Sequence, residues 1–102
     1  MHYVRINYIP LKEGGANTLR AIQAKFLARD DPEQSGLLYA FFGFSNEDRF
    51  CTGVTVWHDQ TKFNASAERW PQVIDGIKDI LDGEARRDEF EIDSHNFPMP
   101  GR

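Results

Sequence analysis

The stretch GVTVWHDQTKF, residues 53–63, carries most of the information about the fold. Its first half is rich in β-branched residues and closes on Trp57, a pattern typical of a strand. Asp59 then stands where a helix N-cap belongs, because its carboxylate can accept hydrogen bonds from the free amides of the next turn. His58 and Phe63 occupy the two positions of a hydrophobic staple around it. The stretch therefore predicts a strand that passes directly into a short helix.

The adjacency of His58 and Asp59 also raises the hypothesis of a catalytic pair, and strand geometry argues against it. Successive residues of a strand point to opposite faces, so Asp59 cannot easily orient the imidazole of His58. We interpret Trp57, His58 and Asp59 as strand end, staple and N-cap. Any chemistry is expected elsewhere, nearer Asn7 than Asp59.

Hydrophobic periodicity extends the same interpretation over the rest of the chain. It predicts strands at 3–11, 36–45, 50–58 and 87–95 and helices at 16–29, 60–66 and 70–81, followed by an irregular tail at 96–102. The predicted inward side of the first helix comprises Ala16, Leu19, Ile22 and Phe26. Pro71 fits the first turn of the last helix, and Gly83 fits its C-terminal cap. A chain of this length favours one domain over residues 1–102, with its core in 3–95.

The order β-α-β-β-α-β predicts the ferredoxin-like α+β fold, a four-stranded antiparallel sheet with helices on one face. The segment 36–45 is apolar on both faces. One face would carry Leu37, Tyr39 and Phe41, and the other would carry Leu38, Ala40, Phe42 and Phe44. Leaving three such side chains in water would cost roughly 5 kcal/mol at about 25 cal/mol per Å². We therefore expect a homodimer in which a second copy covers the open face of the sheet.

Composition excludes several classes of protein. The net charge of −4 argues against nucleic acid or an anionic membrane as a partner. Cys51 is the single cysteine, which predicts no intramolecular disulfide and no cysteine-based metal cluster, and we expect it to be a small buried hydrophobe. Because the first residues lack the pattern of a signal peptide and no apolar run approaches the length of a membrane span, we expect a cytoplasmic protein.

The residues Val54 to Trp57, followed by His58 to Phe63, resemble the "V-x-V-W-x-s-x-x-x-F" segment of the antibiotic-biosynthesis-monooxygenase-like proteins, a branch of the dimeric α+β barrel superfamily. The likeness extends in layout over residues 3–95, and specific identity is concentrated in 54–63. It implies a dimeric α+β barrel. It also implies a small cofactor-independent monooxygenase-like enzyme acting on an aromatic, quinol-type or polyketide-like molecule.

Two other interpretations stay open, because the superfamily also contains haem-degrading enzymes, isomerases, dechlorinating enzymes and proteins without known activity. One is a non-catalytic barrel that binds a small apolar ligand or serves as an assembly domain. The other is a haem protein. The haem-degrading branch uses an Asn on the first strand, a Trp after the short helix and a His on the next helix.

Asn7 matches the first of these haem-branch positions and is predicted to face the barrel. The Trp position falls near Ser66, with Trp70 displaced from it, and helix 70–81 contains no His. Haem would then need His58 or His95. We expect neither a cofactor nor a metal.

The candidate site residues are those that could line or serve an aromatic pocket. The catalytic candidates are Asn7, His58 and His95, and the pocket candidates are Arg5, Tyr39, Phe41, Trp57 and Trp70. Several have structural alternatives, since Trp57 fits the core, His58 fits a staple or plain exposure, and the Asn7 amide could bond to backbone. Asp93 could raise the pKa of His95 from the same strand face.

Charged residues around the last strand have simpler explanations. Arg5 could bind a ligand anion, but pairing with Glu89, Glu91 or Asp93 across the sheet is the favoured interpretation. Those three carboxylates lack a His or Cys at ligand spacing, so a solvated strand face explains them better than a metal. The pair Arg86-Arg87 is interpreted as a solvated strand start.

Overall fold

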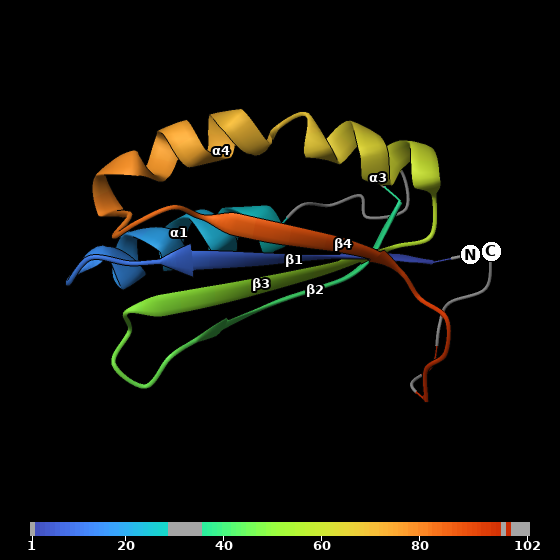
Figure 1. Cartoon of the computed structure of the whole chain (residues 1–102), viewed down its shortest axis with the longest axis horizontal. Coiled ribbons are helices and arrows are strands. Elements are labelled where there is room, and N and C mark those ends of the chain that lie inside the picture. Colours follow the sequence, from blue (N-terminus) through green and yellow to red (C-terminus); the bar gives the residue numbers. More distant parts are fainter. Residues whose placement is uncertain (1, 29–35, 97, 99–102) are drawn as a thin grey trace.

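The computed structural model describes residues 2–28, 36–96 and 98 of the chain. Figure 1 shows its helices and strands. In chain order these are β1 (Tyr3–Pro10), α1 (Gly15–Leu27), β2 (Leu37–Phe44), β3 (Phe50–Trp57), α3 (Gln60–Ala67), α4 (Trp70–Ile77), the 3₁₀ turn η1 (Lys78–Ile80) and β4 (Arg86–Glu91). The predicted β-α-β-β-α-β order is confirmed.

The four strands form one antiparallel sheet in the order β2-β3-β1-β4. Side chains alternate between its two faces, and the helices cover one of them. In Figure 1, α1 lies behind the strands, and the face turned toward the viewer carries none of the described helices. We call these the helix face and the open face. The pairing register of the strands determines the face on which each side chain lies, and therefore which side chains can form one site.

The core lies on the helix face. Its buried cluster comprises Ile9, Leu11, Ala16, Leu19, Cys51 and Ile77. The predicted inward side of the first helix is wrong at one position, because Ile22 is 41% exposed and Gln23 is buried in its place. The amide of Gln23 donates to Sγ of Cys51 over 3.2 Å. Burial raises the pKa of the Cys51 thiol, so this sulfur is a neutral acceptor within the core, as expected of a small buried residue.

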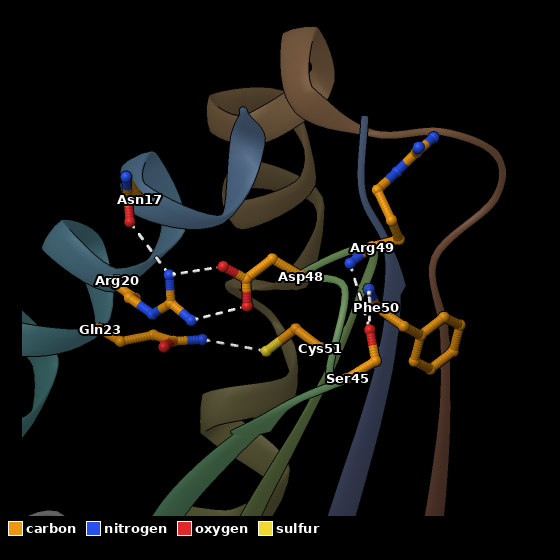
Figure 2. A network of polar contacts seen from close by, with 8 residues as sticks. All are labelled: Asn17, Arg20, Gln23, Ser45, Asp48, Arg49, Phe50 and Cys51. Atoms are coloured by element: carbon orange, nitrogen blue, oxygen red, sulfur yellow. Dashed lines mark hydrogen bonds and ion pairs between the residues drawn. The ribbon is translucent and has the colours of Figure 1, made fainter. Parts of the chain in front are cut away.

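Helix α1 is also held to the β2–β3 turn by a polar network (Figure 2). Arg20 reaches both carboxylate oxygens of Asp48, with N–O distances of 2.8 and 3.2 Å. Asp48 has a positive φ of 56°, a conformation that Asp and Asn adopt more readily than most residues. At the same turn the Ser45 hydroxyl accepts from the amides of Arg49 and Phe50. The Arg20 guanidinium lowers the pKa of Asp48 through its hydrogen bond.

Residues 53–63 form the structure that their pattern predicts. Asp59 caps α3, and its side chain accepts from the Lys62 amide over 2.9 Å. Phe63 is buried and stacks on Tyr3, with ring centroids 5.4 Å apart. The contact between His58 and Phe63 that a staple requires stays a prediction. The strand-to-helix passage thus anchors α3 to β1 and β3.

Three predicted boundaries are corrected. The last helix ends at Ile77 and continues as η1 to Ile80, so Gly83 is no C-cap, and its φ of 123° serves the turn into β4 instead. Strand β4 ends at Glu91 rather than near residue 95. Helix α1 ends at Leu27. The expected helix end at residue 29 and most of the predicted tail at 96–102 lie outside the described residues.

Candidate functional site

The predicted pocket residues do not share one face of the sheet. Tyr39 pairs with Val56, and Val56 pairs with Val4, which places this row on the open face. Arg5 and Asn7 follow Val4 on β1 at odd spacings and therefore point to the helix face. The prediction that Tyr39 and Phe41 line a pocket together with Asn7 is wrong, because Tyr39 and Phe41 are in register with Val4 and Ile6, and residues one apart on a strand point to opposite sides. Tyr39 and Phe41 cannot form walls around Asn7.

The open face contains a shallow apolar hollow. Its volume is about 490 Å³, and it is lined by Val4, Tyr39, Phe41, Val54, Val56 and Ile92. The Tyr39 hydroxyl donates to the carbonyl of Pro98 over 2.5 Å. Among the described residues, no charged side chain lines this hollow. Such a surface can bind apolar groups, and its lining offers no acid, base or anion-binding group for a reaction.

Arg5 is a structural clamp on the helix face. Its Nε donates to Glu89 over 2.7 Å, Nη1 to the Ser66 hydroxyl over 2.7 Å, and Nη2 to the Phe63 carbonyl over 2.9 Å. The guanidinium also lies over the Phe63 ring, 4.4 Å from its centroid. Burial lowers the pKa of Arg5, and its hydrogen bond to Glu89 opposes that shift. The favoured pairing with Glu89 is confirmed, and these contacts join β1, β4 and α3.

Trp57 and the two candidate histidines lie away from Asn7. Trp57 is a core residue, and its indole N–H donates to Thr55 over 2.9 Å. His58 is half-buried just past the end of β3, with a buried Nδ1 that has no partner within the described part of the chain. Because Gly53 is the partner of Asn7, His58 stands five residues further along, about 16 Å away at the strand rise. His95 is exposed beyond the end of β4.

Asn7 sits at the centre of a row that crosses all four strands. It pairs with Gly53 on one side and with Arg87 on the other, and Gly53 pairs in turn with Phe42. Cross-strand partners of this kind have Cβ atoms about 5 Å apart on the same face. Oδ1 of Asn7 is buried and has no hydrogen-bond partner among the described residues. An acceptor left in this state is costly unless a ligand or water satisfies it.

Arg87 brings positive charge to this row. It is half-buried, and its guanidinium carbon lies 5.3 Å from the centroid of the Trp70 ring. In the ranges 2–28 and 36–96, no carboxylate lies within ion-pair distance of Arg87. We call the group on the helix face the Asn7 site and define it as Asn7, Phe42, Gly53, Trp70 and Arg87.

Three members of the Asn7 site were missed from the sequence, namely Phe42, Gly53 and Arg87. Part of the signal for Arg87 was available, because Glu89 was one of the three acidic residues with which Arg5 was expected to pair. In an antiparallel pair, Glu89 opposite Arg5 requires Arg87 opposite Asn7. Arg86 then points to the open face, where its guanidinium covers Tyr8 at 4.4 Å. The two adjacent arginines therefore lie on different faces, as successive strand residues must, and Arg86 is exposed whereas Arg87 is half-buried.

A metal centre finds no support in the described ranges of the chain. They contain no group of three or more His, Cys, Asp or Glu side chains that could hold a metal ion. Among the helices described, none combines the length and apolarity that a membrane crossing demands.

Known structures share this fold. No protein-family model and no curated protein sequence matches the chain. A protein of unknown function from Nitrosomonas europaea, NE2512, superposes with a TM-score of 0.75 at 13% identity, covering 97% of this chain and 96% of that one. The monooxygenase ActVA-Orf6 of Streptomyces coelicolor, solved with nanaomycin D, gives 0.71 at 13% identity, with coverages of 95% and 92%.

The cofactor-independent oxygenase SnoaB from Streptomyces nogalater gives a TM-score of 0.65 at 14% identity, with coverages of 92% of this chain and 95% of that one. At these identities the likeness establishes the fold alone. The chain has the ferredoxin-like fold that the antibiotic-biosynthesis-monooxygenase-like proteins share, which confirms the fold implied by the resemblance.

Proposed function

We propose that this chain is a small cofactor-independent monooxygenase that oxidises a planar aromatic phenol, of quinol or polyketide type, at the Asn7 site. The observation that carries the proposal is a cross-strand pair, half-buried Arg87 and Asn7 with its buried amide oxygen, in which neither side chain has a partner of opposite polarity in the described part of the chain. Similarity of fold to ActVA-Orf6 and SnoaB, whose names describe a monooxygenase and a cofactor-independent oxygenase, supports the reaction class.

The side chains of the Asn7 site suit an anionic aromatic ligand. Arg87 favours the deprotonated form of a bound phenol, because a positive charge at short range stabilises the anion. The Asn7 amide can accept from a second hydroxyl through Oδ1 and donate to an oxygen through Nδ2. Trp70 and Phe42 supply aromatic surface on either side of this polar pair. Binding and charge stabilisation therefore come from the same four side chains.

An electron-rich phenolate can react with dioxygen without a cofactor. For an anthrone, the anion transfers one electron to dioxygen, and the resulting radical and superoxide combine to form a carbon–oxygen bond. The hydroperoxide formed by protonation then loses water, leaving a carbonyl where a methylene stood. One oxygen atom enters the product and the other leaves as water, so no external reductant is needed. The role of Arg87 is to hold the negative charge of the starting anion.

Oxygen uptake tests this function. Purified protein is mixed with an anthrone and with a panel of quinols in an oxygen electrode, without added cofactor. We expect uptake above the protein-free rate for at least one substrate, reduced tenfold or more in Asn7→Ala and Arg87→Gln. Arg86→Gln is the matched control, since its side chain lies on the open face, and it keeps the wild-type rate. The absence of uptake with every substrate contradicts the function.

The open face supports a second element of the proposal, a homodimer. Phe41 is 58% exposed and Phe90 51% exposed on this face, beside the apolar hollow. Burying aromatic side chains of this size against a second copy is worth about 2 kcal/mol each. The all-apolar lining also favours the alternative function, a non-catalytic barrel that binds a small apolar ligand or serves in assembly. Retained dimerisation and ligand binding without any oxygen uptake would favour that alternative.

A further inference from the structure

Gly53 is a glycine for reasons of space. It lies in the middle of β3 and is not among the residues with positive φ, so its backbone does not require glycine. A Cβ placed there would lie 2.9 Å from Cδ1 and 3.0 Å from Cε1 of Phe42, and 4.0 Å from Nδ2 of Asn7. Glycine weakens a strand interior, and in such positions it often marks a close approach by another group. Here the Phe42 ring makes that approach, beside the Asn7 amide.

The Phe42 ring also packs against α1. Phe26 meets it edge to face, with ring centroids 6.2 Å apart and an interplanar angle of 78°. The position of the Phe42 ring is therefore fixed by two neighbours, the backbone at Gly53 and the ring of Phe26. Phe42 is half-buried, and both its ring and the Asn7 amide lie within 4.0 Å of the position that a Cβ at Gly53 would take. The ring forms one wall of the Asn7 site.

We propose that Gly53 and Phe42 determine the size of the aromatic ligand that the Asn7 site accepts. The ligand class is a planar fused-ring phenol, whose oxygen meets Asn7 and Arg87 while an outer ring packs against Phe42. This inference rests on the proposed function, since it assigns the specificity of the same site. A single-ring phenol reaches Asn7 and Arg87 without touching Phe42. Only the binding of the larger ligand should therefore depend on the position of the Phe42 ring.

The substitution Gly53→Ala should displace the Phe42 ring. Ordinary van der Waals contact begins near 3.4 Å, so the ring must retreat by about 0.5 Å from a new Cβ at 2.9 Å. The ring cannot retreat toward α1 without displacing Phe26, and it therefore enters the site. Replacing Phe42 by Leu removes the ring carbons that the Cβ meets. The double variant Gly53→Ala with Phe42→Leu relieves the clash and reopens the site.

The experiment measures binding rather than turnover. Quenching of tryptophan fluorescence gives Kd for two probes, 1,8-dihydroxyanthraquinone, which is already oxidised, and phenol. We expect Gly53→Ala to weaken the tricyclic probe at least tenfold and phenol less than twofold, and the double variant to recover most of the loss. Phe42→Leu alone should weaken the tricyclic probe only about two- to threefold, because an outer ring loses its packing surface, and leave phenol unchanged; the double variant should match this single variant. Thermal melting confirms that each variant is folded.

Several outcomes overturn the inference. Equal weakening of both probes in Gly53→Ala, an unchanged tricyclic Kd, or a double variant as weak as Gly53→Ala each contradict a wall set by these two residues. If Gly53→Ala does not fold, an unchanged tricyclic Kd in Phe42→Leu contradicts it equally. Absence of binding of either probe to the wild type also overturns it. Size-selective binding without oxygen uptake in the wild type contradicts the proposed function and leaves the specificity assignment intact.

Discussion

Asn7 and Arg87 are cross-strand partners on the helix face of the sheet. Within the described part of the chain, Asn7 has a buried oxygen without a hydrogen-bond partner and Arg87 has a charge without a carboxylate. Each alone has a structural explanation, because arginines stack on tryptophans and asparagines bond to water. Together they offer a cation for an anionic oxygen and an acceptor for a hydroxyl of the same ligand. The proposed chemistry depends on this pairing.

The charge of Arg87 should be measurable on a bound ligand. In Arg87→Gln, we expect the pKa of a bound phenolic probe to rise by about one unit relative to the wild type, because a nearby cation stabilises the phenolate. Spectrophotometric titration of the bound probe measures this value. Arg86→Gln should leave it unchanged. An identical pKa of the bound probe in the wild type and in Arg87→Gln would show that Arg87 does not lie near the bound ligand.

Arg5 should be a stability residue rather than a ligand-binding one. Arg5→Met leaves Glu89 without its partner and removes a donor from the Phe63 carbonyl, so we expect a loss of about 2–3 kcal/mol in the free energy of unfolding. Urea denaturation measures it. Arg69→Met, at an exposed position before α4, is the control and should cost less than about 0.5 kcal/mol. A similarly small loss for Arg5→Met would contradict the claim that Arg5 stabilises the fold by joining β1, β4 and α3.

The Arg20–Asp48 pair should make stability depend on pH. The pKa of Asp48 is lowered in the folded protein by its hydrogen bond from Arg20, relative to an ordinary value of 3.8. A depressed folded pKa stabilises the protein fully above the unfolded value, and this contribution is lost as pH falls through the folded value. We therefore expect the stability difference between wild type and Asp48→Asn to be constant above about pH 5 and to shrink below about pH 4.

Urea denaturation at a series of pH values measures that difference. Asn is the matched substitution at Asp48, because it also tolerates the positive φ of 56° at this turn. A difference that grows as the pH falls would have the wrong sign for this ion pair.

The open face should hold two copies together. We expect the wild type to have twice the chain mass of 11.7 kDa in solution at micromolar concentration, and Phe41→Lys to return it to 11.7 kDa, because a lysine cannot be buried unpaired in an apolar interface. Analytical ultracentrifugation measures both. Val73→Lys is the control, since Val73 is also an exposed apolar residue, at 44%, but lies on α4. A monomeric wild type contradicts the proposed dimer.

Local signals made much of the fold predictable. Alternation located β1, a continuous apolar run located β2, and a β-branched run located β3. Asp59 located the start of α3, because an N-cap acts within one turn. The end of β4 was not predictable in the same way. Residues 92–95 keep the alternating pattern of a strand, but β-pairing ends at Glu91, where β1 runs out opposite Tyr3. Pairing partners, rather than pattern, decide where an edge strand stops.

The site was less accessible because it depends on register. Residue chemistry was enough to select Asn7 as a candidate, but only the structure separates it from Tyr39 on the opposite face. Arg87 and Gly53 carry no signal alone, since one belongs to a charged pair and the other is an isolated glycine. They become candidate site residues only because they flank Asn7, Gly53 on β3 and Arg87 on β4.

The most direct test of the central claim uses dioxygen labelled with ¹⁸O. Wild-type protein and an anthrone are incubated without added cofactor, and the quinone product is analysed by mass spectrometry. The proposed reaction predicts one ¹⁸O atom in the product, formed faster than without protein and at least tenfold more slowly with Arg87→Gln, but not with Arg86→Gln. Product formation equal to the protein-free rate, or equal rates for the wild type and Arg87→Gln, would contradict oxygenation at the Asn7 site.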